Sequence, residues 1–170
     1  EDVVPISFID MPPLEEAKAI RDECHRALEK ARKTGARDWE ISVNTRFADW
    51  GDKLVEAIET HRKTLDVGIQ AIRINDIVLA NNSTETLFET GLAIKAASPF
   101  PYTQVLGYSN GCVGYLPRAE DFPPGGWDIY KRWYGVPDLL FQAYSLPTAI
   151  HPNSEQQVVD RTLALLDQLR

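Results

Sequence analysis

Gln70-Ala-Ile-Arg-Ile-Asn-Asp-Ile-Val-Leu-Ala80 is the stretch that decides the fold. Apolar residues fill both of its arms, and Asn75 and Asp76 stand between them. Asn and Asp tolerate the backbone of a tight turn, so this pattern predicts a β-hairpin that turns at these two residues. The second arm, residues 77–80, is apolar on both faces, which is typical of a central strand covered on both sides.

Segments with helical periodicity precede and follow the hairpin in the sequence. Apolar residues recur at steps of three and four over residues 14–31, and a second helical region covers 38–64, where Gly51 predicts a kink or break. A last helix is expected to begin at Asn153 or Ser154, because apolar residues line one of its faces. The members of that face are Val158, Val159, Thr162, Leu165, Leu166 and Leu169.

The remaining segments complete a sheet with helices packed on it. Residues 3–9, 102–108 and 139–144 have strand character, and Ser83 or Thr84 is expected to cap a helix that runs to about Ala97. Residues 110–114 predict a tight loop. The pattern therefore indicates an α/β (mixed α+β) fold with a mixed sheet, and 170 residues favour a single domain spanning 1–170.

Composition excludes some classes of partner. A net charge of -7, with basic residues scattered among acids, argues against nucleic acid, which needs clustered Lys and Arg. No apolar run approaches the ~20 residues that a transmembrane helix needs. Cys24 and Cys112 lack a metal-binding spacing, while a disulfide between them and the cellular compartment both stay open.

Polar residues follow two of the predicted strands. Glu85 comes after the hairpin, and Asn110-Gly-Cys-Val-Gly-Tyr115 comes after residues 102–108. Ligands gather at strand ends in α/β sheets, so both segments are site candidates. The plainer interpretations are a favourable charge in the first turn of a helix for Glu85, and an ordinary turn for Asn110, Gly111 and Gly114. A carboxylate pair of Glu85 and Glu89 on one helix face is a further alternative.

Other chemistry-bearing residues point less clearly to a site. The three histidines, His25, His61 and His151, lack metal-binding spacing and fit surface or core positions. Four aromatic residues are candidates for an apolar pocket wall, a docking surface or plain local packing: Trp127, Tyr130, Trp133 and Tyr134.

The run from Ile72 to Trp127 resembles the neutral/alkaline (non-lysosomal) ceramidases and their relatives. In that family a strand leads to Pro-Gly-Glu or Pro-Ala-Glu and a helix, and a second strand leads to Gly-Tyr-x-Asn-x-x-x-x-Tyr. Ser83-Thr84-Glu85, Glu89 to Phe100, Gly107 to Tyr115 and Gly125-Gly126-Trp127 look like these parts. The resemblance is clear over about a third of the chain, and Ser83-Thr84 departs from it by replacing Pro-Gly.

The resemblance implies a zinc-dependent amide hydrolase that acts on N-acyl sphingolipid-like, lipid-like amide substrates. Zinc in this family is held by two histidines, a glutamate and a tyrosine, and the last two match Glu85 and Tyr115. Asn110, Gly111 and Gly114 would support the site or lie near the substrate. The histidines come from the N-terminal half of the family's catalytic domain, so we expect this chain to be the C-terminal portion of a longer polypeptide.

We therefore expect the chain alone to bind zinc weakly and not to turn over ceramide. Two other functions stay open. One is a non-catalytic binding or scaffold domain of the same fold in a larger protein. The other is a hydrolase that uses the Glu85 and Glu89 carboxylates.

Overall fold

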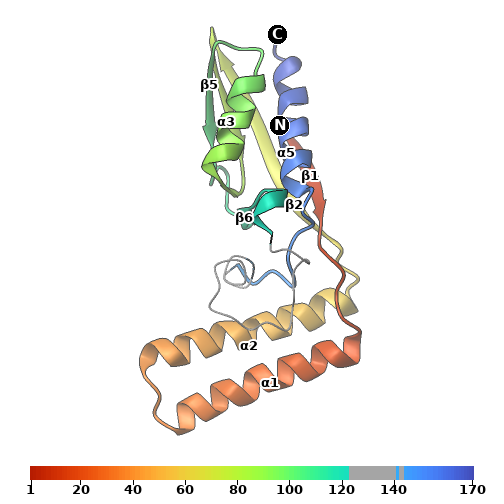
Figure 1. The fold of residues 1–170 in the computed structure, drawn as a ribbon, viewed down its shortest axis with the longest axis vertical. Helices are drawn as coiled ribbons and strands as arrows, with labels where there is room; N and C mark the ends of the chain where they lie inside the picture. Colours follow the sequence, from red (N-terminus) through yellow and green to blue (C-terminus); the bar gives the residue numbers. More distant parts are fainter. Residues whose placement is uncertain (123–140, 142–143) are drawn as a thin grey trace. The chain divides into compact units, whose positions relative to one another are not determined.

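The computed structural model describes residues 1–122, 141 and 144–170, and these form two compact units (Figure 1). The sheet unit contains Glu1–Ser7, the described residues of 64–127 and Ile150–Arg170. The helical unit contains Phe8–Lys63 and the described residues of 128–149. The expectation of one domain stays a prediction, because two such units can belong to one domain or to two.

A four-stranded mixed sheet forms the centre of the sheet unit. Its order is β1 (Asp2–Ser7), β2 (Thr64–Ile74), β3 (Ile77–Asn82) and β5 (Tyr102–Leu106). The first three strands pair antiparallel, and β3 pairs parallel with β5. The predicted hairpin is confirmed: Ile74 pairs with Ile77, and Asn75 takes the left-handed turn conformation with φ of 55°. Strand β3 lies inside the sheet, as its apolar sequence predicted.

Two helices cover one face of this sheet. They are α3 (Phe88–Ala97) and α5 (Ser154–Asp167), drawn in green and blue in Figure 1. Strand and helix side chains meet there in one apolar core of Val78, Ala80, Ile94, Phe100, Val159 and Leu166. A mixed sheet with helices packed on it is thus the observed fold, and it supports the α/β prediction.

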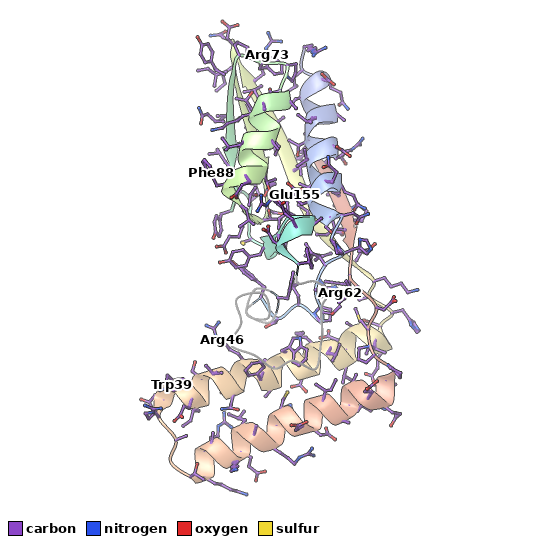
Figure 2. All side chains as sticks on the ribbon, in the orientation of Figure 1. Trp39, Arg46, Arg62, Arg73, Phe88 and Glu155 are labelled. Atoms are coloured by element: carbon purple, nitrogen blue, oxygen red, sulfur yellow. The ribbon has the colours of Figure 1, made fainter. Side chains whose placement is uncertain are left out.

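Arg73 ties the far end of β2 to the end of the last helix (Figure 2). Its guanidinium donates hydrogen bonds to the carbonyl oxygens of Leu169 at 2.6 Å and Arg170 at 3.3 Å. It also lies 5.0 Å from the centre of the Phe100 ring. A cation at a helix C-terminus satisfies free carbonyls and opposes the helix dipole.

The helical unit is built on an antiparallel pair, α1 (Leu14–Lys33) and α2 (Asp38–Glu59). Its core consists of Ala17, Cys24, Trp50, Leu54 and Val55. A break at Gly51, one of the two outcomes that the sequence predicted, is wrong, because α2 is continuous through this residue. A Cβ at Gly51 would lie 2.9 Å from the Arg21 Cα, so the glycine is there to let the two helices approach closely.

The predicted helix start at Ser83 or Thr84 is also wrong. Helix α3 begins at Phe88, and the residues before it form a short strand, β4 (Glu85–Thr86). Strand β4 pairs parallel with β6 (Tyr115–Leu116), and a 3-10 turn, η1 (Ala119–Asp121), follows. The side chains of Ser83 and Thr84 are buried and bond to Gly68 of β2 and to Asn82 respectively, so they do not cap a helix.

Some predicted features fall outside the described residues. These include most of the predicted strand at 139–144, Gly125-Gly126, and the aromatic residues Trp127, Tyr130, Trp133 and Tyr134. Both cysteines, Cys24 and Cys112, are free thiols, so the disulfide that the sequence left open is absent. Within the described ranges, no helix has the length and apolar character to cross a membrane.

Gly51→Ala is expected to destabilise the helical unit. The new methyl group would meet the Arg21 backbone, and overpacking of this kind costs about 1–3 kcal/mol, of which alanine's helix propensity returns at most about 1 kcal/mol. Gly91→Ala in α3 is the matched control, since the nearest atoms to a Cβ there lie 3.9 Å away. Urea denaturation followed by circular dichroism measures both, and equal or increased stability of Gly51→Ala would contradict the close-approach account.

Candidate functional site

The short strand pair β4–β6 places Glu85 directly beside Tyr115. The two residues are partners in its parallel register, and the Glu85 backbone N–H donates to the Gly114 carbonyl oxygen at 2.8 Å. Partners in adjacent strands project their side chains to the same face, a few ångströms apart. The two residues expected to bind metal are therefore brought together, and both are half-buried.

Two phenols share the Glu85 carboxylate. A hydrogen bond to this carboxylate raises the pKa of Tyr115, with burial and the negative charge of Glu85 adding to the effect. The same kind of hydrogen bond raises the pKa of Tyr108 to about 12. A carboxylate that accepts from a phenol favours the protonated phenol, which is why both pKa values rise. We call Glu85, Tyr108 and Tyr115 the Glu85 cluster; the Cys112 thiol lies close enough to interact with it electrostatically.

Backbone hydrogen bonds lock the two segments of this site together. Tyr108 N donates to Thr84 O at 2.9 Å, Ser109 N to Asn82 O at 3.0 Å, and Val113 N to Ser83 O at 2.8 Å. Gly107 sits so close that a Cβ there would lie 2.8 Å from Thr84 O. The loop after β5 is thus fitted against the turn after β3, with glycine needed at the contact.

The Asn82 side chain organises the turn that leads to Glu85. Its carboxamide oxygen accepts from Thr84 N at 3.0 Å, Thr84 Oγ1 at 2.6 Å and Thr86 Oγ1 at 2.8 Å. The two threonine hydroxyls also lie 3.0 Å apart. Asn82 and Thr84 are almost fully buried, so these bonds are made away from water and hold the turn in one conformation.

Ser83 anchors the same turn to β2. Its Oγ accepts from Gly68 N at 2.9 Å, while Ser83 N donates to Gly68 O at 2.9 Å. The side-chain bonds of Ser83 and Thr84 therefore direct the chain into β4.

The predicted tight loop at 110–114 is present. Asn110, Gly111 and Gly114 all have positive φ, at 60°, 124° and 147°. Gly114 is buried and contacts Glu85 directly through its carbonyl, whereas Asn110 and Gly111 are exposed. Asn110 also lines a cavity of about 370 Å³ beside Gln70, Asn81 and Ser109. Of the three supporting residues, the structure therefore brings only Gly114 against the Glu85 backbone.

The idea of a Glu85 and Glu89 pair on one helix face is wrong. Glu85 belongs to strand β4, while Glu89 is an exposed residue in the first turn of α3. The i, i+4 neighbourhood that the alternative requires exists only within a continuous helix. The favourable-charge interpretation of Glu85 at a helix start fails for the same reason.

The described residues provide a small donor set. Among them, no group of three or more His, Cys, Asp or Glu side chains is arranged to hold a metal ion. The His25 ring lies 3.1 Å from both Asp52 carboxylate oxygens, and His151 Nδ1 lies 2.6 Å from Asn153 Oδ1. The carboxylate of Glu85 and the phenol of Tyr115 supply oxygen atoms, of which the carboxylate is an ordinary zinc ligand.

The sequence did not predict the roles of four residues in this site: Asn82, Thr84, Thr86 and Tyr108. The Asn82-x-Thr84 spacing is a known local signal, because Asn side chains bond the backbone two residues on. Tyr108 lies within the quoted Gly107-to-Tyr115 motif, but its link to Glu85 depends on a contact between segments more than twenty residues apart.

No family model, curated protein or solved structure was found to match this chain.

Asn82→Ala is expected to destabilise the sheet unit by about 1–3 kcal/mol more than Asn81→Ala. The first change leaves the buried donors of Thr84 and the half-buried Thr86 hydroxyl without their acceptor, and the loss is most costly for the buried donors. Asn81 is a matched control: it is similarly buried, and its Oδ1 has no hydrogen-bond partner within the described residues. Denaturant unfolding of both variants tests this, and equal losses would remove Asn82 from its assigned role.

Glu85→Gln is expected to lower the pKa of Tyr108 and Tyr115 toward the ordinary tyrosine value. The reason is that a neutral amide replaces the carboxylate that accepts their hydrogen bonds and whose negative charge favours their protonated forms. Ultraviolet absorbance titration of tyrosinate measures this, with Glu89→Gln as the control. An unchanged high-pH phase in Glu85→Gln would show that another group raises the pKa of Tyr108.

Proposed function

We propose that this chain is the C-terminal part of a ceramidase-like, zinc-dependent amide hydrolase, to which it contributes Glu85 and Tyr115 as two zinc ligands. One observation carries the proposal: the β4–β6 register sets the Glu85 carboxylate and the Tyr115 phenol side by side, with a hydrogen bond between them. These are the two residues that the family resemblance picks out independently from sequence.

The chemistry of the pair suits a metal ion. Zinc binds carboxylate oxygen readily, and a cation in place of the shared proton would turn the Tyr115 phenol into a phenolate ligand. Without metal, the Tyr115 phenol keeps its proton and donates a hydrogen bond to the Glu85 carboxylate, which is why the pKa of Tyr115 is raised. When bound, zinc supplies an acidified water and a polarised carbonyl for amide hydrolysis.

The substrate class follows from the resemblance alone. It is an N-acyl sphingolipid-like amide, in which the bond to be broken joins a fatty acyl carbonyl to an amine. Water adds to the carbonyl carbon, the C–N bond breaks, and the products are a fatty acid and a free amine. The chain's own part in this proposal is to hold two ligand oxygens at fixed positions.

The remaining ligands are proposed to be two histidines from an N-terminal half of the same polypeptide. The rings of His25 and His151 are already engaged with Asp52 and Asn153 in the described structure. We therefore propose that the chain alone binds zinc weakly and does not turn over ceramide.

Zinc titration of the chain tests the ligand assignment. We expect weak binding that raises a tyrosinate absorbance band, because the bound metal deprotonates Tyr115. Glu85→Gln and Tyr115→Phe should each reduce both the affinity and the band, while Tyr102→Phe on β5 should change neither. Ceramide hydrolysis by the chain alone should be absent.

Micromolar or tighter zinc binding that survives both substitutions would refute Glu85 and Tyr115 as ligands. Turnover of ceramide by the chain alone would refute the half-site.

A non-catalytic binding or scaffold domain is the second candidate. It is favoured by the scarcity of donors, since the described residues offer no group of three His, Cys, Asp or Glu around a common point. The full-length sequence separates the two candidates. A His-x-His segment and a further histidine upstream favour the enzyme, and their absence favours the scaffold.

A further inference from the structure

Tyr108 is held in a backbone conformation that its own side chain disfavours. Its φ is 54°, in the left-handed region that bulky residues rarely adopt. The conformation is fixed by the hydrogen bond from Tyr108 N to Thr84 O at 2.9 Å and by the tight fit of Gly107 against the same carbonyl. Such an outlier calls for an explanation in what the side chain does.

Packing does not explain the outlier. The Tyr108 side chain is 59% exposed and belongs to neither apolar core cluster. Its hydroxyl donates a hydrogen bond to the Glu85 carboxylate. The strained backbone thus presents a phenol to one particular acid and buries little apolar surface in doing so.

The two phenols reach Glu85 by different routes. Tyr115 does so as the strand partner of Glu85 in β6, whereas Tyr108 does so from the loop after β5. A carboxylate has two oxygens with several lone pairs, so it can bind a metal and still accept a hydrogen bond. Ligands of metals are commonly oriented by such outer hydrogen bonds.

We propose that Tyr108 is a positioning residue that fixes the orientation of the Glu85 carboxylate as a metal ligand. This role rests on the proposed zinc site, but the hydrogen bond from Tyr108 to Glu85 is present without metal. Tyr115 is the ligand phenol and Tyr108 the orienting phenol, so the two tyrosines have different roles on one carboxylate.

The test compares Tyr108→Phe with Tyr102→Phe in the full chain. Both changes remove a single hydroxyl from an exposed tyrosine near β5, where Tyr102 is 62% exposed. Three quantities are measured: thermal unfolding, the order of the Glu85 side chain by carbon NMR relaxation without metal, and zinc affinity. A merely structural hydroxyl would change the first and leave the other two alone.

We expect Tyr108→Phe to unfold like the wild type, to make the Glu85 side chain more mobile, and to weaken zinc binding by about 10–100-fold, as loss of an orienting partner typically does. Tyr102→Phe should match the wild type in all three. In a Glu85→Gln background, Tyr108→Phe should have no further effect on zinc, because its effect passes through the carboxylate.

Two negative outcomes are distinct. If the wild type binds no zinc or binds it without Glu85, the proposed function fails, and the metal-free order of Glu85 still decides whether Tyr108 positions it. If Glu85 is equally ordered in Tyr108→Phe and the wild type, the positioning role is overturned, whatever the zinc result.

Discussion

The site depends on the hydrogen bonds of the Asn82 carboxamide and on the backbone hydrogen bonds that join the turn after β3 to the loop after β5. One oxygen accepts from Thr84 N, Thr84 Oγ1 and Thr86 Oγ1, in surroundings that exclude water. These bonds hold the turn at residues 83 and 84 that leads from β3 into β4. Glu85 consequently lies in a strand whose partner is Tyr115.

The sheet topology brings the two halves of the Glu85 cluster to the same edge. Strands β3 and β5 are parallel neighbours, so the turn after Asn82 and the loop after Leu106 leave the sheet at the same end. Ligand-binding residues collect at this edge in α/β sheets for that reason. Four backbone hydrogen bonds then join the two segments, including Glu85 N to Gly114 O. Fold and site are linked through the crossover of α3 between these strands.

The Glu85 cluster is held in place by contacts within the protein itself. A carboxylate flanked by two phenols is held by buried hydrogen bonds on one side and remains partly accessible on the other. The positive φ of Tyr108 and the close contact at Gly107 cost conformational energy. The backbone hydrogen bonds between the two segments offset that energy. The proposed zinc site would explain why this strain is kept, because metal ligands work best when the protein already holds them in position.

The sequence by itself determined the features that local pattern specifies. The hairpin at Asn75-Asp76, the buried strand after it, and the apolar faces of α1 and α5 follow from periodicity and turn chemistry, and Glu85 and Tyr115 were singled out from a motif. Only the tertiary structure decided that Ser83 and Thr84 do not start a helix, because the same hydroxyls that cap helices bond here with Asn82 and Gly68. It also decided that α2 continues through Gly51, where the close approach of Arg21 is a contact between helices. The pairing of Glu85 with Tyr115, and the addition of Tyr108, depend on strands and loops distant in sequence meeting in space, which no local pattern encodes.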